Sequence, residues 1–291
     1  MRKYFIVVNP AAGSRRSSTR VKRILKRVRS RFDFELFETK PEFHADRLIR
    51  DFFDPAIFTD ILVVGGDGTI NESLNGIDGK TVTVSFISTG TGNDIARSHV
   101  GKLRLDKQIG SALNGSIYKV DTGKCNGRVF MNGVGIGFDG KVVEDMMIKG
   151  KRFNNSLAYL HTVTRLLSGY VESELNIIID GNRIQRTVFL MTIAKGKYFG
   201  GGFLVNPFAK PDDGQLDICI INKIPVKKRF LYLPTMKSGG HKSLKEVEFY
   251  KCRECIIEPN DQMVAHIDGE FAGSPPFHIK VCPGSLDVRK Y

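Results

Sequence analysis

Residues 61–69 constrain the fold of this chain more than any other stretch. A short apolar run at 61–64 is followed at once by Gly65-Gly66-Asp67-Gly68-Thr69, and helix-compatible residues come next. Short β-branched runs that end in glycines are typical of buried strands in parallel sheets. The glycines leave bare backbone N–H groups in front of a helix, and such groups bind phosphate. Asp67 suits a Mg²⁺ ion that travels with a nucleotide; the alternative is a tight turn in which Asp67 is a helix cap.

The first 120 or so residues alternate between strand-like and helix-like patterns. This alternation predicts a parallel sheet with helices on both faces. Ligands of such sheets bind outside the carboxyl ends of the strands. Loops at 9–13, 65–69 and 88–94 each follow a predicted strand, so we expect them to meet at one edge of the sheet. The predicted strands are 4–8, 33–37, 61–64 and 82–87, and the predicted helices are 17–30, 42–53 and 70–76.

After Asp121 the pattern changes, and strand-like runs dominate. They predict a second, mostly antiparallel domain, a β-sandwich. We expect an α/β domain at 1–122, completed by a returning strand in 286–291, and a β-sandwich domain at 123–285. The strands expected in the second domain are 128–132, 174–179, 187–194, 216–221, 246–258, 264–267 and 277–281, with helices at 139–148, 156–168 and 226–237.

The net charge of +13 is concentrated in residues 15–31, which hold nine Lys and Arg and no acid. Val21, Ile24, Leu25 and Val28 follow helical spacing, so the segment predicts a helix with one buried stripe and a basic outer face. This face is either a solvated surface or a binding surface for an anionic membrane or for nucleic acid. We favour the membrane, because no nucleic-acid-binding motif is present.

Cysteine usage and hydropathy set the expected compartment. Five cysteines are few and odd in number, which favours a reduced, cytoplasmic chain over a disulfide scaffold. Cys252 and Cys255 have the spacing of metal ligands, but no second pair follows, and we interpret them as strand or turn residues rather than zinc ligands. No apolar run approaches the ~18 residues of a membrane span. A cytoplasmic protein with peripheral membrane contact is therefore expected.

Six motifs occur in a fixed order along the chain. They are NPAAGS at 9–14, GGDGTINE at 65–72, GTGNDIAR at 90–97, VDTG at 120–123, PDDGQLD at 211–217 and DGE at 268–270. With them the chain resembles the diacylglycerol kinase catalytic family, which includes bacterial soluble lipid kinases and, as distant kin, sphingosine and ceramide kinases. The resemblance spans nearly the whole chain. Ser88 and Ile95 stand where many relatives have proline and phenylalanine, and neither change removes a functional group.

The resemblance implies an ATP- and Mg²⁺-dependent lipid kinase. Asp67, Asp121 and Asp268 would organise the catalytic Mg²⁺, and Glu270 or Asp268 would take the proton of the lipid hydroxyl. A second, structural Mg²⁺ would bind the carboxylate of Asp213 and the backbone carbonyl oxygens of Lys210 and Gln215. The implied ATP site comprises Asn9, Pro10, Ala11, Ala12, Gly13, Thr39, Gly65, Gly66, Asp67, Gly68, Thr69, Ile70, Asn71, Thr91, Asn93 and Asp94.

Diacylglycerol is the expected acceptor, with phosphatidic acid as the product. Sphingosine, ceramide, phosphatidylglycerol and a non-lipid alcohol remain alternatives, as does a nucleotide-binding regulator without turnover. The retained Asp67, Asp121, Asp268 and Glu270 argue against the regulator, because a sensor needs no base. The expected partners are a membrane lipid and an anionic membrane surface; a homodimer is left open and nucleic acid is not expected. The loop at 199–203 is either a plain loop or an entrance for an acyl chain.

Overall fold

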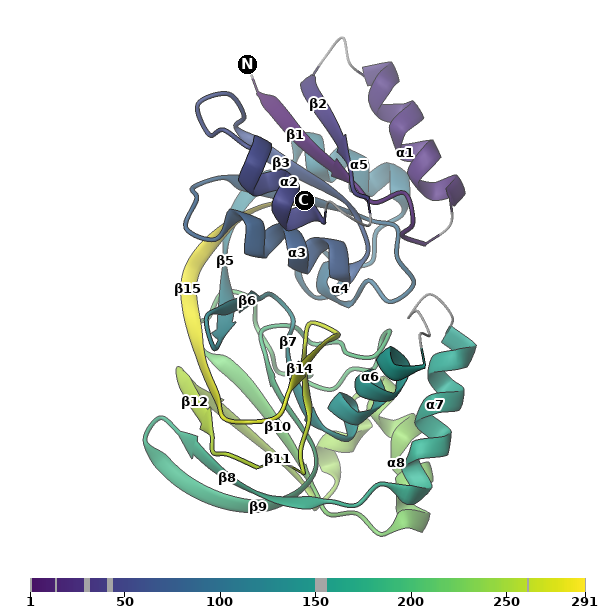
Figure 1. Ribbon diagram of the computed structural model, residues 1–291, viewed down its shortest axis with the longest axis vertical. Helices are drawn as coiled ribbons and strands as arrows, with labels where there is room; N and C mark the ends of the chain where they lie inside the picture. Colours follow the sequence, from purple (N-terminus) through teal and green to yellow (C-terminus); the bar gives the residue numbers. More distant parts are fainter. Residues whose placement is uncertain are drawn as a thin grey trace. The chain divides into compact units, whose positions relative to one another are not determined.

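The computed structural model describes residues 2–13, 15–28, 32–40, 44–149, 156–260 and 262–290. The chain forms two compact units (Figure 1). Unit 1 comprises Met1–Val120 and Gly284–Tyr291, and unit 2 comprises Asp121–Pro283. The chain passes from unit 1 to unit 2 within strand β5 (Ser116–Cys125) and returns within strand β15 (Phe277–Lys290).

Unit 1 is built on a parallel sheet. Its strands pair in the order β4-β3-β1-β2, and Asp287 and Val288 of β15 add a parallel neighbour beside β4. The sheet confirms the parallel arrangement predicted from the alternating pattern. The strands are β1 (Lys3–Val8), β2 (Asp33–Glu38), β3 (Asp60–Gly65) and β4 (Thr83–Ser88).

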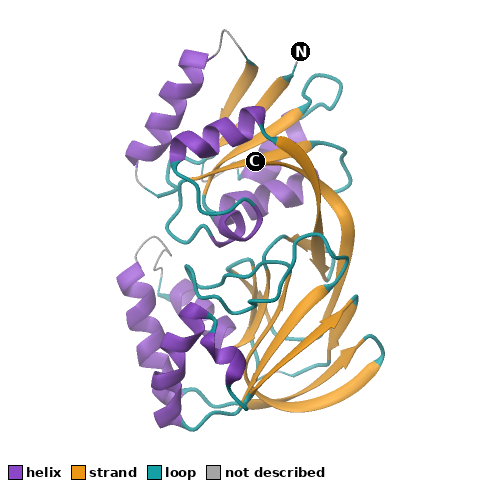
Figure 2. Ribbon diagram, turned by 180° about the vertical axis from the view of Figure 1, so that it is seen from behind, coloured by secondary structure: helices purple, strands orange, loops and turns teal. Residues whose placement is uncertain are grey.

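Helices cover both faces of the unit 1 sheet (Figure 2). Tyr4 and Ile6 of β1 pack in one core cluster with residues of α1 and α5, whereas Phe5 faces the other side and contacts Phe53 and Phe58. Alternate residues of a strand point to opposite faces, so a run buried on both sides is apolar throughout. The helices are α1 (Arg15–Val28), α2 (Ala45–Phe52), α3 (Asp67–Ile77), α4 (Asp94–His99) and α5 (Leu105–Asn114).

The described strands of unit 2 pair antiparallel, as expected. One path runs β14-β13-β7-β9-β8-β12-β15, and β10 pairs with both β9 and β11. The strands are β6 (Arg128–Phe130), β7 (Gly133–Gly137), β8 (Ser173–Ile179), β9 (Asn182–Ala194), β10 (Leu216–Asn222), β11 (Val247–Cys252), β12 (Glu254–Ile257), β13 (Ala265–Ile267) and β14 (Glu270–Gly273).

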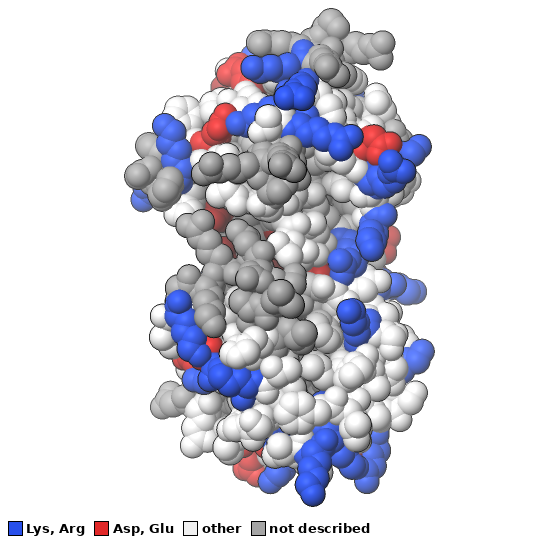
Figure 3. Space-filling model, turned by 90° about the vertical axis from the view of Figure 1, so that its right-hand side faces the viewer, with Lys and Arg blue, Asp and Glu red and all other residues white. Residues whose placement is uncertain are grey.

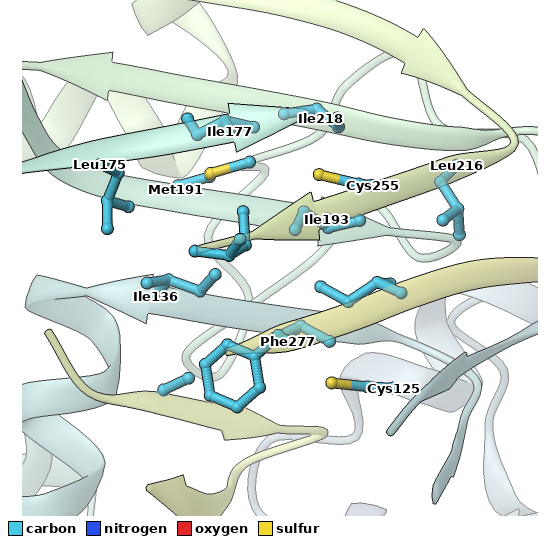
Figure 4. Close-up of a cluster of buried hydrophobic side chains, with 14 of the residues drawn as sticks. Cys125, Ile136, Leu175, Ile177, Met191, Ile193, Leu216, Ile218, Cys255 and Phe277 are labelled. Carbon is cyan, nitrogen blue, oxygen red and sulfur yellow. The ribbon is translucent and has the colours of Figure 1, made fainter. Parts of the chain in front are cut away.

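Two apolar clusters stabilise unit 2. The first lies between strands, where Ile177, Met191 and Ile218 meet in the cluster drawn in Figure 4. The second lies on the other face of β9. Leu190, which precedes Met191 in that strand, points to this face and packs against the helices of unit 2. The helices are α6 (Phe138–Ile148), α7 (Ser156–Gly169) and α8 (Val226–Ser238), and the short helix η1 (Gly240–Ser243) follows α8.

The strand expected at 246–258 is in fact two strands, β11 and β12. Cys252 and Cys255 are both buried, whereas Arg253 and Glu254 between them are exposed. This spacing of three breaks the two-residue period of a continuous strand. The carboxylate of Asp180 accepts the backbone N–H groups of Arg253 and Glu254, at 2.9 Å each, and so supports the break. The strands expected separately at 277–281 and 286–288 are parts of the single strand β15.

Helix α1 agrees with the prediction of a buried stripe and a basic outer face. Val21 and Leu25 are buried, and Arg20, Arg23 and Lys26 are exposed. Lys and Arg side chains predominate over acidic ones on the molecular face of Figure 3. Residues 29–31 of the predicted basic segment, and residues 42 and 43 of the second predicted helix, lie outside the described residues.

Candidate active site

The three glycine-containing loops of unit 1 meet at the carboxyl edge of its sheet. The Nδ2 group of Asn9 donates a hydrogen bond of 2.9 Å to Oγ1 of Thr69, which joins the first loop to the second. Gly13 has a φ of 61°, and a Cβ atom there would lie 1.6 Å from the carbonyl oxygen of Thr89. Only glycine allows this approach, since a side chain at Gly13 would collide with the backbone of the third loop.

Asp67 connects the second loop to the start of α4. Its carboxylate accepts the backbone N–H groups of Asp94 and Ile95, at 3.1 Å each. Behind it, a Cβ atom on Gly90 would lie 2.7 Å from Cα of Gly66, so the two backbones are in close contact. Asp67 therefore accepts amides at the start of α4 rather than capping α3, the helix that it begins, and it joins the second loop to the third.

Two buried hydroxyl groups at this edge lack a protein partner. The Oγ of Ser88 and the Oγ1 of Thr89 are shielded from solvent, and among the described residues neither has a hydrogen-bond partner. Buried polar groups are normally paired, so unpaired hydroxyls at this edge of the sheet fit a polar ligand such as a phosphate. Of the other predicted ATP-site residues, Thr39 follows β2 and donates its N–H to Val8, while Ile70 and Asn71 are buried in α3.

In unit 2, Asp268 anchors the turn between β13 and β14. Its carboxylate accepts hydrogen bonds from the backbone N–H groups of Met131, Asn132 and Gly133, at 2.9, 3.0 and 2.7 Å respectively. Its own N–H donates to the carbonyl oxygen of Gly133 at 2.9 Å. Asp268 is 7% exposed and has a φ of 49°, a left-handed conformation that Asp adopts more readily than most residues. These contacts fix the turn between β13 and β14 to the backbone at 131–133.

Glu270 lies two residues further on and is far more accessible. Its side chain is 39% exposed and forms an ion pair with Arg128. The turn that carries it is held by His266, whose Nδ1 accepts the N–H of Gly269 at 3.1 Å. Because Nδ1 is an acceptor, Nε2 carries the proton and donates to Asp139 at 2.8 Å. His266 and Asp139 are both buried.

A buried lysine, Lys195, binds the turn at residues 211–215. The ammonium group of Lys195 lies 2.9 Å from Oδ2 of Asp121 and 2.9 Å from Oδ1 of Asp213. It also donates to the carbonyl oxygen of Gln215 at 2.6 Å. The carboxylate of Asp121 accepts in addition the N–H of Gly214 at 2.7 Å. Two of the predicted ligands of a structural Mg²⁺, Asp213 and Gln215, thus bind a lysine, whereas Lys210 is exposed.

An apolar pocket lies inside unit 2. Its walls come from α6, α7, α8, β9 and the loop at 199–203, with mainly aromatic and aliphatic side chains. Arg229 in the wall is neutralised by Glu172 at 2.7 Å and donates to the carbonyl oxygen of Leu167. Burial lowers the pKa of His241, also in the wall, so this ring stays neutral at physiological pH. Asp139 also lines this pocket and is an acidic residue in its mainly apolar wall.

Cys252 lies in β11 and Cys255 in β12, in agreement with the interpretation of both as strand or turn residues. Cys252 and Cys255 are buried in the first apolar cluster, and burial raises the pKa of Cys252 to about 12. Among the described residues, no group of three or more His, Cys, Asp or Glu side chains is placed to hold a metal ion. Asp67 belongs to unit 1, whereas Asp121 and Asp268 belong to unit 2.

Two family models match the chain in succession. The diacylglycerol kinase catalytic domain matches residues 3–125, and the YegS C-terminal NAD kinase beta sandwich-like domain matches residues 132–290. The second match alone covers more than half of the 291 residues. The chain belongs to the bacterial soluble diacylglycerol and lipid kinase family.

Individual members of this lipid kinase family are similar along their whole length. The chain is 29% identical to a diacylglycerol kinase of Bacillus subtilis (strain 168), over 95% of this chain and 92% of that one. It is 26% identical to a diacylglycerol kinase of Staphylococcus aureus (strain MRSA252), over 97% and 90% respectively. A crystal structure of a Bacillus anthracis diacylglycerol kinase covers 100% of this chain and 97% of its own, with 24% identity and a TM-score of 0.76, which shows the shared fold.

As a member of the diacylglycerol and lipid kinase family, the chain is a lipid kinase that uses ATP as its phosphoryl donor. None of the helices that the structure describes has the length and hydropathy needed to cross a membrane. Three residues near the candidate groups escaped the sequence analysis: Arg128, Asp139 and Lys195. None of them lies in a recognisable motif, and each acts through a partner that is distant in sequence.

Proposed function

We propose that the protein transfers the terminal phosphoryl group of ATP to a hydroxyl of diacylglycerol and so forms phosphatidic acid. The observation that carries this proposal is the apolar pocket of unit 2, which has Asp139 in its wall. Asp139 is hydrogen-bonded to His266, and His266 holds the turn that carries Glu270. The pocket would take an acyl chain, and the link to the turn would bring the lipid hydroxyl toward Glu270. The names of the relatives support the same substrate.

Unit 1 is proposed to bind ATP, and unit 2 the lipid. The glycine-containing loop before α3 and the N-terminus of α3 favour anionic phosphates. The unpaired hydroxyls of Ser88 and Thr89 would supply two more donors. The residues of the three loops named as the implied ATP site therefore remain our proposal for the phosphate-binding part of unit 1.

Asp67 is the residue that would hold Mg²⁺ beside the phosphates. It is a carboxylate that joins the second loop to the third, and carboxylates are preferred Mg²⁺ ligands. When bound, the ion neutralises charge on the phosphates. That Asp121 and Asp268 join this ion stays a prediction. In unit 2 the carboxylate of Asp121 accepts the N–H of Gly214, and the carboxylate of Asp268 accepts the N–H of Met131. Both residues therefore also have a structural role.

Glu270 is proposed as the base that receives the proton of the lipid hydroxyl. It is accessible, and its partner Arg128 holds it in place. Asp268, the other candidate, is buried and engages three backbone amides. A positioned base contributes ~10²–10⁴-fold to the rate. Positioning of the acceptor and charge neutralisation supply the remainder of the acceleration in phosphoryl transfer.

Peripheral membrane contact is proposed to involve two surfaces. The basic surface of α1, with Arg20, Arg23 and Lys26, would attract anionic lipids at ~1 kcal/mol for each charge. On α8, Phe230 is 44% exposed and Leu231 is 70% exposed, and Lys227 and Lys228 lie beside them in sequence. Apolar side chains with neighbouring lysines are typical of helices that lie in a membrane interface. The homodimer left open by the sequence stays a prediction.

The test is phosphoryl transfer from labelled ATP to vesicles that contain diacylglycerol, sphingosine, ceramide and phosphatidylglycerol, with products identified by mass. We expect phosphatidic acid as the main product. The Glu270→Gln variant should lose ~10²–10⁴-fold in kcat with an unchanged unfolding temperature. Glu254→Gln, which alters an acid that is 50% exposed and pairs with His278, is the matched control and should keep full activity. Label in another lipid alone would refute diacylglycerol as substrate, and an active Glu270→Gln would refute the base.

A further inference from the structure

Lys195 directly follows strand β9 and is among the most deeply buried side chains of unit 2. The side chain is 0% exposed, although lysine is one of the residues least often buried completely. An ammonium group has three N–H donors and no acceptor. Those three donors match three acceptors: Asp121, Asp213 and the carbonyl oxygen of Gln215, at 2.9, 2.9 and 2.6 Å. The positive charge is therefore fully coordinated by protein oxygens.

Asp213 has no oxygen left without a cationic partner. Its Oδ1 binds Lys195, and its Oδ2 binds the ammonium group of Lys251 at 2.5 Å. Lys251 also lies 3.4 Å from the buried Asp217. The carboxylates of Asp121, Asp213 and Asp217 thus each lie within ion-pair distance of an ammonium group of the chain itself.

These oxygens are the ones that the family resemblance implies for a structural Mg²⁺. That ion demands six oxygen ligands in near-octahedral geometry at 2.0–2.1 Å. A Mg²⁺ on Asp213 and Gln215 would share both oxygens with the buried ammonium of Lys195, and two cations held by the same oxygens repel each other. The residues present around the turn therefore do not fit the implied ion.

We propose that Lys195 supplies the cation at this turn in place of a divalent metal ion, and that removal of its ammonium group opens the turn to Mg²⁺. Lys195 joins three segments of unit 2: it follows β9, it binds Asp121 in β5, and it binds the turn that precedes β10. A second link supports the same arrangement, because the N–H of Asp121 donates to the carbonyl oxygen of Pro211 at 2.7 Å. The lysine thus makes this junction independent of metal supply.

The experiment measures thermal unfolding of the full chain without nucleotide, first in a chelator and then in millimolar Mg²⁺. We expect the wild type to unfold at the same temperature in both conditions. Lys195→Asn should unfold earlier in the chelator and regain about 3 °C or more in saturating Mg²⁺. Adding Asp213→Asn to Lys195→Asn should abolish this recovery. Lys251→Asn, which removes the exposed lysine from the same carboxylate, is the matched control and should stay insensitive to Mg²⁺.

Binding of Mn²⁺ as a probe ion provides a second measurement. Equilibrium dialysis of the wild type and of Asp213→Asn should show the same Mn²⁺ content in both. Saturable binding or Mg²⁺ stabilisation in the wild type that Asp213→Asn abolishes would overturn the proposal, and so would a folded Lys195→Asn that does not respond to Mg²⁺. If Lys195→Asn does not fold, the comparison of the wild type with Asp213→Asn decides alone. Neither readout depends on which lipid is phosphorylated.

Discussion

The imidazole of His266 lies 2.8 Å from the carboxylate of Asp139, and this buried pair links the wall of the apolar pocket to the turn that carries Glu270. The ring fills both of its hydrogen-bonding positions, since its other nitrogen accepts the N–H of Gly269. The turn is therefore held both by the side chain of His266 and by the hydrogen bonds that the carboxylate of Asp268 accepts from the backbone at 131–133.

Breaking the pair should reduce turnover without weakening nucleotide binding. His266→Phe removes both hydrogen bonds, so we expect kcat to fall about 10- to 100-fold, because small misplacements of a catalytic group are costly. The KM for ATP should be unchanged, since His266 belongs to unit 2. Asp139→Asn retains an acceptor oxygen and should keep most of the activity. Steady-state kinetics decide, and equal losses in kcat and in ATP affinity would contradict a positioning role.

Asp268→Ala should destabilise the protein. The change leaves the buried N–H groups of Met131, Asn132 and Gly133 without their acceptor. Each unsatisfied group costs about 1–3 kcal/mol, so we expect the free energy of unfolding to drop by about 2–4 kcal/mol after relaxation. Urea unfolding measures this. Asp268→Asn keeps an acceptor oxygen and tolerates the left-handed conformation, so it should lose less; an Asp268→Ala variant as stable as the wild type would disprove the anchoring role.

Vesicle binding should depend on both α8 and α1. Leu231→Ser removes an exposed apolar side chain, and we expect roughly tenfold weaker binding at any salt concentration. Replacing Arg20, Arg23 and Lys26 by serine should weaken binding to anionic vesicles by at least tenfold at low salt and little at high salt. Sedimentation with vesicles measures both effects. Ile117→Ser, a change at a side chain that is 50% exposed in β5, is the control; a loss as large as that of Leu231→Ser would speak against α8 as the docking helix.

Glu248 should make the stability of unit 2 sensitive to acid. Hydrogen bonds from Arg186, Tyr250 and Asn222 outweigh burial and lower the pKa of Glu248 to about 2. A depressed pKa means stability that is complete above the unfolded-state pKa of about 4.3 and is lost as the pH falls toward 2. Glu248→Gln should therefore cost about 2–3 kcal/mol at pH 7 and progressively less below pH 4. Urea unfolding across this range tests it, and a gap that widens in acid would show the opposite linkage.

Unit 1 was predictable because its elements are local. The run at 61–64 and the glycines after it already define a buried strand and a close-packed turn. Strand β7 was missed for a physical reason. It contains Gly133, Gly135 and Gly137, a composition that normally indicates a loop, yet a Cβ atom on Gly135 would lie 2.3 Å from Nε2 of His266. The glycines are required by a contact with a distant strand, which no local pattern reveals.

The candidate site residues of unit 1 could likewise be predicted from the sequence, whereas the contacts of those in unit 2 could not. The motifs in unit 1 are contiguous, so the meeting of the three loops followed from strand order alone. In unit 2 the important partners are far apart in sequence, as for Lys195 with Asp121 or His266 with Asp139. A buried lysine is recognisable only after the fold supplies its acceptors. The difference between Asp268 and Glu270 likewise depends on burial, which the motif Asp-Gly-Glu does not encode.

Strand β15 has a consequence for how the chain is made. Its residues Asp287 and Val288 pair with β4, and Arg289 forms a buried ion pair with Asp60 at 2.6 Å. During synthesis these residues leave the ribosome only after all of unit 2. Until then the parallel sheet lacks its β15 strand, and the carboxylate of Asp60 lacks its counter-ion Arg289. A fragment that stops at residue 120 should therefore fold poorly, whereas a circular permutant that places 284–290 ahead of β1 should allow unit 1 to fold before unit 2 is synthesised.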